Sequence, residues 1–179
     1  MTDASMIGVP RYERHPNDLY ETPAWVTETL LDFFAQVNIR PQAVWEPACG
    51  NGAMVRVLET RIKKVHATDK EQDFFKWTAP PPDAEWIITN PPYKLQDEFL
   101  DHALAIAPRI CLLLRNEFDC AGGRRRFFDK AFRAKIVLTK RPRWIVGSTG
   151  APRHNYAWFI WDKSRFHSRL FHAYGKTFV

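Results

Sequence analysis

The stretch Asn90-Pro91-Pro92-Tyr93 constrains the fold of this chain more than any other. The residues before it, 84–89, are mostly apolar and predict a short buried strand. A proline fixes φ and has no backbone N–H, so two in a row cannot extend a strand inside a sheet. We therefore expect a stiff loop that presents an amide, a bare carbonyl and an aromatic ring. These groups suit a planar amino compound, because Asn90 and the Pro91 carbonyl can accept two N–H bonds while Tyr93 stacks.

A second loop of this kind lies upstream. Residues 43–45 predict a short apolar strand, and the apolar positions from Met54 onwards predict a helix. Strand, glycine loop and helix in this order begin a doubly wound α/β unit, and the glycines of the loop, Gly50 and Gly52, allow a ligand close to the backbone. The loop is not a phosphate cradle, because Val55 replaces the third glycine of Gly-x-Gly-x-x-Gly and no Gly-Lys-Ser/Thr occurs.

Both loops should face one crevice, because an open α/β sheet binds its ligands outside the carboxyl ends of its strands. Glu46 begins the glycine loop, where a carboxylate disfavours phosphate and favours a cationic amino group or hydroxyls. Asp69 ends a second predicted strand, 65–68, at the position where dinucleotide folds bind ribose hydroxyls. A ligand with a ribose and a cationic amino acid part but no phosphate indicates S-adenosylmethionine.

The other segments predict an α/β fold with a doubly wound, mostly parallel sheet. Thr22 is expected to cap a helix that has Pro23 at its first position. Two strands near the end of the chain, predicted to be its last, are expected to form an antiparallel hairpin at the edge of the sheet. The predicted helices are 23–36, 95–106 and 122–132. A buried strand is predicted at 109–115, and the two strands of the hairpin span 135–139 and 156–161.

Composition limits the class of protein. The 179 residues, 45% of them hydrophobic, suffice for one packed domain, expected at 18–179 after a loosely ordered arm at 1–17. No apolar run approaches the ~20 residues that span a bilayer, and the N-terminus lacks the pattern of a secretory signal. The three cysteines are scattered, and the histidines show no metal-ligand spacing. We expect a cytoplasmic protein with no metal site and no membrane contact.

Charge is divided unevenly along the chain. Residues 1–119 hold 12 Lys and Arg against 18 Asp and Glu, whereas residues 120–179 hold 14 against 2. A strongly basic last third favours a polyanionic partner, which we expect to be nucleic acid, although a solvated basic surface is the alternative. Trp144 lies among these basic residues and could stack a base or belong to the core. The candidate nucleic-acid contacts are Arg124, Arg125, Arg126, Arg141, Arg143, Trp144 and Arg153.

Four motifs in this order resemble class I S-adenosylmethionine-dependent methyltransferases, and specifically the DNA adenine-N6 enzymes of phage or prophage type. The resemblance covers residues 18–162 and implies a Rossmann-like methyltransferase domain with a seven-stranded sheet. Asp69 matches the ribose-binding acid, and Asn90-Pro91-Pro92-Tyr93 matches the catalytic loop. The remaining motifs resemble the segments that hold the methionine part and the cofactor, and they contain Tyr20, Thr22, Pro23, Glu46, Pro47, Ala48, Gly50 and Gly52.

The resemblance also implies a mechanism. A methyl group passes directly from a sulfonium to the exocyclic amine of a base that has been flipped from a duplex. Asn90 and the Pro91 carbonyl hold the amine and offset its developing charge, and no catalytic base is required. Asp73 and Phe74 could contact the adenine of the cofactor, as an Asp-Phe pair does in the family, or they could simply begin a helix.

Alternatives remain at this point. Only 86 residues follow Tyr93, too few for the separate target-recognition domain that sequence-specific members usually carry, so a protein partner could supply target choice. The same catalytic loop also serves enzymes that methylate rRNA adenine or a protein glutamine amide. A nucleic-acid-binding module that keeps the fold without catalysis is a third possibility. No cysteine follows a proline, which excludes the nucleophile of cytosine-C5 methyltransferases.

Overall fold

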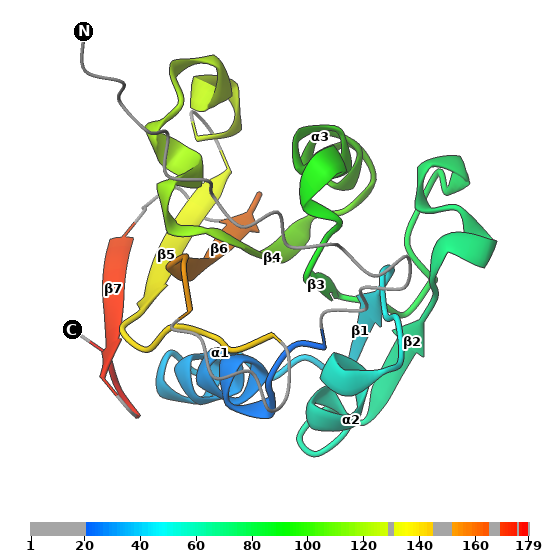
Figure 1. Cartoon of the computed structure of the whole chain (residues 1–179). Helices are drawn as coiled ribbons and strands as arrows, with labels where there is room; N and C mark the ends of the chain where they lie inside the picture. The colour runs from blue at the N-terminus through cyan, green and yellow to red at the C-terminus, as the bar shows by residue number, and fades with distance from the viewer. Residues whose placement is uncertain (1–20, 129–130, 145–151, 165–168, 175, 179) are drawn as a thin grey trace, which may run out of the picture.

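One sheet runs through the molecule (Figure 1). The structure is a computed structural model that describes residues 21–128, 131–144, 152–164, 169–174 and 176–178. Within these residues the sheet has eight strands in the order β2-β1-β3-β4-β6-β5-β7-β8. The strands are β1 (Ala43–Glu46), β2 (Lys64–Ala67), β3 (Trp86–Thr89), β4 (Arg109–Arg115), β5 (Phe132–Leu138), β6 (Tyr156–Asp162), β7 (Arg169–Tyr174) and β8 (Thr177–Phe178).

The pairing of the strands confirms the predicted fold class. β2, β1, β3 and β4 are parallel neighbours, whereas β6 runs antiparallel to both β4 and β5. Seven strands have four or more residues, as expected for the seven-stranded sheet, and the two-residue β8 adds an eighth. The predicted arm at residues 1–17 lies outside the described residues.

The prediction that β5 and β6 are the last two strands was wrong. β7 pairs parallel with β5, and β8 turns back antiparallel to β7, so these two strands form the edge of the sheet. The hydrophobic pattern of the sequence did not predict β7, because a strand near the edge of a sheet needs less apolar surface than a central one. Arg169 is exposed and Leu170 is 57% exposed, so the alternation typical of a half-buried strand is weak there.

Helices cover both faces of the sheet. In Figure 1, α1 (Ala24–Gln36) and α2 (Ala53–Leu58) lie below the sheet and α3 (Gln96–Ile106) lies above it. The α1-side core contains Val26 and Leu30 of α1 with Leu113 of β4, and the α3-side core contains Phe99 of α3 with Leu112 of β4. Neighbouring residues of one strand therefore serve opposite cores, as the alternation of side chains requires.

The segment predicted as a helix at 122–132 has another structure in its described residues, which leave out 129 and 130. It forms a 3-10 turn, η5 (Gly122–Phe127), after η4 (Asn116–Cys120), and β5 begins at Phe132. Its aromatic residues pack on β6 instead of forming a helical face, and Phe128 meets Phe159 and Trp161. The indole of Trp161 donates a hydrogen bond to the Phe127 carbonyl over 2.7 Å. Tertiary contacts thus outweigh the helical spacing of these apolar residues.

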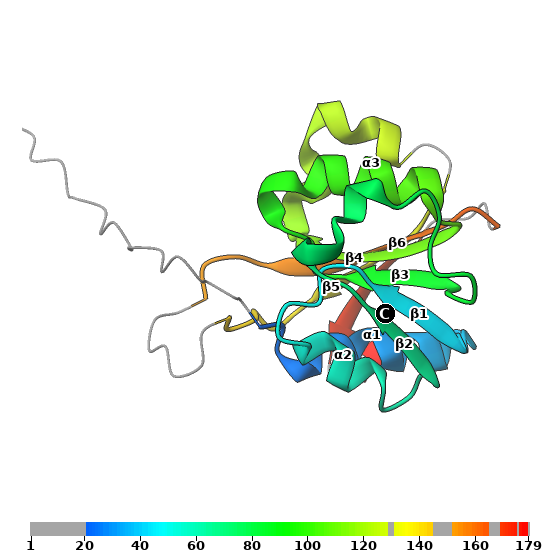
Figure 2. The same cartoon turned by 90° about the vertical axis from the view of Figure 1, so that its right-hand side faces the viewer.

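The parallel strands bring several loops to one edge of the sheet. The residues that follow β1, β2, β3 and β4 lie at this edge, as expected for the two motif loops. β6 is antiparallel to β4 and β5, so Tyr156 and the β5–β6 connection lie there too. Figure 2 shows this edge on the left, where the chain enters β6.

Candidate active site at the carboxyl ends of the strands

The Asn90 side chain is held from two directions. Its amide nitrogen donates to Thr22 Oγ1 over 3.2 Å, and Tyr93 donates its phenolic hydrogen to Asn90 Oδ1 over 2.7 Å. Pro91 is buried and Pro92 is exposed, and a 3-10 turn, η3 (Tyr93–Leu95), follows them. The prolines stop the strand as predicted, and the next turn directs Tyr93 back toward Asn90.

Thr22 does not cap α1, contrary to the prediction. The cap position is occupied by Pro23, with φ −57° and ψ 137°, and no side chain accepts a hydrogen bond from the helix there. Thr22 is only 7% exposed, and its hydroxyl faces Asn90. The chain therefore uses this hydroxyl to join the start of α1 to the loop after β3, 68 residues later.

Tyr93 lies at the end of a row of aromatic rings. Its ring centroid is 5.7 Å from that of Tyr156 at an interplanar angle of 33°, and Trp144 meets Tyr156 edge-on at 4.8 Å. Burial, followed by the neighbouring Tyr156, raises the pKa of Tyr93 well above its ordinary value, so its phenol stays protonated. Tyr156 is not among the predicted site residues, because only the pairing of β6 with β4 brings it here.

Glu46 is a buried carboxyl group at the end of β1. Its side-chain Oε1 accepts a hydrogen bond from Ala48 N over 3.0 Å, whereas Oε2 has no hydrogen-bond partner within the described part of the chain. Burial raises the pKa of Glu46 to about 8, and the charge of Asp69 adds to this rise. Thr89 opposes the rise, although its hydroxyl is itself buried without reaching hydrogen-bond geometry. Two polar groups at neighbouring strand ends are thus left for a ligand.

The loop after β1 turns sharply at its two glycines. Gly50 has φ 51° and Gly52 has φ 75°, a left-handed conformation that favours glycine. The loop is anchored to the end of β2, because Cys49 N donates to the Thr68 carbonyl over 3.0 Å. These angles explain why glycine occupies both positions, and the close approach of a ligand to this backbone stays a prediction.

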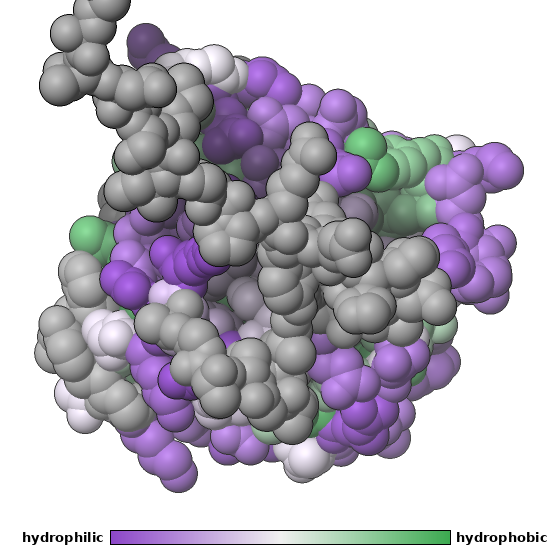
Figure 3. Space-filling view, in the orientation of Figure 1, coloured by the Kyte–Doolittle hydropathy of each residue, from purple (hydrophilic) through white to green (hydrophobic). Residues whose placement is uncertain are grey.

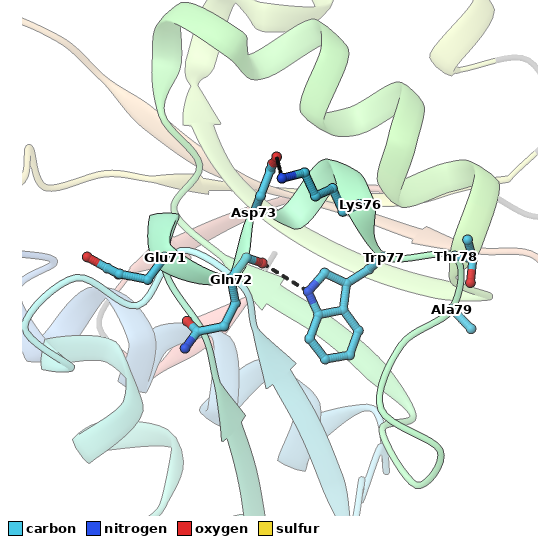
Figure 4. A pocket seen from close by; sticks show the side chains of 7 residues that line it. All are labelled: Glu71, Gln72, Asp73, Lys76, Trp77, Thr78 and Ala79. Atoms are coloured by element: carbon cyan, nitrogen blue, oxygen red, sulfur yellow. Dashed lines mark hydrogen bonds and ion pairs between the residues drawn. The ribbon is translucent and has the colours of Figure 1, made fainter.

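Asp69 and Asp73 flank a short turn after β2, η1 (Lys70–Gln72). Asp73 begins the next turn, η2 (Phe74–Lys76), where its carboxylate accepts from Phe75 N over 3.2 Å. Figure 4 shows this carboxylate paired with Lys76 beside a cavity of about 390 Å³. The cavity is lined by Glu71, Gln72, Asp73, Lys76, Trp77, Thr78 and Ala79.

Phe74 belongs to the α3-side core. It is 5% exposed and stacks on Phe99 with ring centroids 4.0 Å apart. Phe75 is the accessible ring of the pair, since it is 41% exposed. Figure 3 shows a hydrophobic area between α3 and the segment after β2. Two exposed hydrophobic residues belong to these parts of the chain: Phe75 lies in the segment after β2, and Leu95 immediately precedes α3.

The basic candidates fall into two groups. Arg124 pairs with Asp97 over 3.0 Å and Arg126 with Asp101 over 2.8 Å, so both are bound to α3, and Arg125 lies on the same turn. The second group lies in the β5–β6 connection at the edge that carries Asn90, where Arg141 donates to Asn155 Oδ1 over 2.7 Å. This group contains Arg141, Arg143, Trp144 and Arg153, and Trp144 also packs against the α1-side core.

Tyr20 lies outside the residues that the structure describes. Among the described residues, no group of three or more acidic, histidine or cysteine side chains could hold a metal ion. Nor does any helix in this part of the chain have the length and apolar character needed to cross a membrane.

Comparison with known proteins identifies the fold. No family model matches the sequence, and no curated protein does either. The structure resembles a proposed class I S-adenosylmethionine-dependent methyltransferase from Listeria monocytogenes (TM-score 0.60, 9% identity, 93% of this chain and 69% of that one). It also resembles a proposed RNA methyltransferase from Pyrococcus horikoshii (TM-score 0.58, 14% identity, 85% and 91% covered).

A third similar structure is a type I restriction-modification methyltransferase subunit from Streptococcus thermophilus (TM-score 0.56, 10% identity). The match covers 89% of this chain but 50% of that subunit, so this chain corresponds to about half of it. These likenesses confirm the Rossmann-like methyltransferase fold that the sequence analysis expected.

Proposed function

We propose that this protein is an S-adenosylmethionine-dependent methyltransferase whose target is an exocyclic amino group, adenine N6 in DNA. The observation that carries the proposal is the Asn90 amide, which Thr22 and Tyr93 hold at the carboxyl end of β3. The buried Glu46 and the glycine turn end the adjacent strand β1. A polar amide, an aromatic ring and a buried acid thus lie together at the carboxyl ends of the strands, where α/β sheets bind their ligands.

The described residues fit the proposed cofactor. Glu46 Oε2 and the Thr89 hydroxyl are buried with no hydrogen-bond partner among the described residues, so a cationic amino group placed there would satisfy them. Asp69 would bind ribose hydroxyls, and Asp73 with Phe74 would adjoin the adenine, where Phe75 is the ring able to touch a ligand. When bound, the cofactor supplies a methyl group already activated on a sulfonium. The segments proposed to hold it contain Tyr20, Thr22, Pro23, Pro47, Ala48, Gly50 and Gly52.

The protein's own residues have three tasks in this reaction. Asn90 Oδ1 and the Pro91 carbonyl would accept hydrogen bonds from the two N–H groups of the amine and offset its positive charge as the new bond forms, until the nitrogen releases one proton to solvent. Tyr93 would stack on the base, and Asn90 Oδ1 has a second lone pair that can accept from the amine beside the Tyr93 hydroxyl. Tyr156 packs against the Tyr93 ring, and Trp144 packs against Tyr156.

Nucleic acid as substrate is supported by the basic β5–β6 connection at the same edge, which includes Arg141, Arg143 and Arg153. DNA is proposed from the motif resemblance, with RNA adenine and a glutamine amide as the other targets to test. We further propose that a protein partner contributes to target choice. The similarity to a methyltransferase subunit of a restriction-modification system is compatible with that arrangement.

The test is methyl transfer from labelled S-adenosylmethionine to unmethylated duplex DNA, with bulk RNA and whole protein in parallel, followed by mass spectrometry. N6-methyladenine in DNA is the expected product. Asn90→Ala should lose transfer by about 10²–10³-fold, as when one such acceptor or donor is removed, and should still bind the cofactor. Gln36→Ala, an exposed change at the far end of α1, is the matched control. Equal transfer by Asn90→Ala would contradict the assignment.

A further inference from the structure

Arg115 lies beside the aromatic row of the proposed site. It is the last residue of β4 and pairs in register with Tyr156, the first residue of β6. Leu113 and Tyr156 both belong to the α1-side core, and side chains two residues apart on a strand share one face. Arg115 therefore projects on the same side of the sheet as Tyr156, whose ring contacts Tyr93. The positive charge of Arg115 also acts on Tyr93 directly, since it lowers the pKa of that phenol against the effect of burial.

The guanidinium of Arg115 is available for a ligand. The side chain is exposed and has no hydrogen bond or ion pair with any residue that the structure describes. Arg124 and Arg126 differ, because the carboxylates of α3 already hold them. A planar guanidinium offers several N–H donors in a geometry that matches phosphate oxygens.

His154 and Arg153 belong to the segment that enters β6 beside the end of β4. Asn116 N donates to the Asn155 carbonyl over 3.0 Å, which fixes the start of β6 beside the end of β4. The pKa of His154 is lowered by partial burial first, then by the charge of Arg115, and also by Arg153, while Glu117 opposes them. The charges of Arg115 and Arg153 thus both lower the pKa of the His154 ring.

We propose that Arg115, Arg153 and His154 form a phosphate-binding site that grips the nucleic-acid backbone next to the target nucleotide. This inference rests on the proposed function, because it names how the same site holds its substrate. Arg115 ends β4, and Arg153 and His154 lie just before β6, whose first residue Tyr156 contacts Tyr93 beside Asn90. A phosphate held there keeps the attached base within reach of Tyr93.

The first experiment measures the affinity of a fluorescent DNA oligonucleotide over a series of salt concentrations. Arg115→Gln should weaken binding and reduce the slope of log K against log salt by about 0.9, the value for one lost phosphate contact on duplex DNA. Arg115→Gln combined with Arg153→Gln should reduce it by about 1.8. Lys63→Gln removes an exposed charge at the amino end of β2, on the opposite edge, and should leave the slope unchanged. An unchanged slope in Arg115→Gln would overturn the proposal.

The second experiment follows the His154 ring by NMR, with its signal assigned from a His154→Gln sample. A bound phosphodiester should raise the pKa of His154, and Arg115→Gln should raise it in the free protein. A His154 signal that responds to inorganic phosphate but not to the oligonucleotide would also overturn the proposal. Both readouts are independent of catalysis. If the protein does not methylate DNA but the salt slope still depends on Arg115, the proposed function is wrong and the phosphate site is supported.

Discussion

Tyr93 donates its phenolic hydrogen to Asn90 Oδ1 over 2.7 Å, so the oxygen proposed to hold the substrate amine already has a donor. Thr22 accepts from the other end of the same amide, which fixes the direction in which Oδ1 points. An amine that enters the site can donate to the second lone pair of Oδ1. Oδ1 therefore has a hydrogen-bond donor before the amine binds, so this buried acceptor is not left unsatisfied in the free protein.

Two substitutions of Tyr93 distinguish the contribution of its hydroxyl group from that of its ring. Tyr93→Phe keeps the ring and frees Asn90 Oδ1, so we expect kcat and KM within several-fold of the parent values. Tyr93→Ala removes the stacking surface, which costs about 1–3 kcal/mol per base, so KM for the nucleic acid should rise roughly tenfold or more. Steady-state kinetics with both variants checks this. Equal losses in Phe and Ala would mean that the hydroxyl rather than the ring matters.

Thr22→Val removes the acceptor that orients Asn90 while keeping the shape of the side chain. The loss of a buried hydrogen bond costs about 1–3 kcal/mol, and we expect kcat to fall roughly tenfold because the amide loses its fixed direction. Thr22→Ser restores the hydroxyl and should recover most of the rate. Cofactor affinity, measured by calorimetry, should change less than kcat. A fall in affinity as large as the fall in kcat would assign Thr22 to cofactor binding alone.

Glu46 should make stability depend on pH. Its pKa is about 8 in the folded chain and 4.5 ordinarily, so between these values the native state binds a proton that the unfolded state has lost. Stability is therefore full below pH 4.5 and falls as pH rises toward 8, by an amount on the order of several kcal/mol. Glu46→Gln cannot ionise and should lack this loss.

Urea unfolding of the parent chain and of Glu46→Gln at pH 5 and pH 9 measures the difference. Every other titrating group is common to the two chains, so its contribution largely cancels. A difference that is the same at both pH values would show that Glu46 is ionised in the folded protein.

Phe74 and Phe75 are expected to respond oppositely to truncation. Phe74→Ala leaves a cavity in the α3-side core beside Phe99 and should destabilise the fold by about 3–5 kcal/mol. Phe75→Ala should cost little stability, because this ring is 41% exposed, and should weaken cofactor binding. Thermal unfolding and calorimetric titration test the pair. A stable Phe74→Ala with reduced cofactor affinity would reverse the two roles.

Several features could be predicted from residue order alone. The two loops at strand ends, the parallel order of the strands near them and the apolar face of α1 follow from local patterns, because glycine, proline and hydrophobic spacing act over a few residues. The position of Phe74 could not be predicted, since either of two adjacent phenylalanines could enter the core. Which one does so depends on the path of the turn that Asp73 begins.

The sequence by itself determined that Asn90 and Glu46 would lie at one edge of a doubly wound sheet, since each follows a strand and parallel strands end together. Only the tertiary structure decided their partners. Thr22 reaches Asn90 from 68 residues away, and Tyr156 and Arg115 meet because β6 inserts antiparallel between β4 and β5. The physical reason is the distance along the chain over which each effect acts. Backbone preferences and hydrophobic periodicity act between residues close in sequence. Strand pairing and buried hydrogen bonds join residues far apart in sequence, and no local pattern marks such partners.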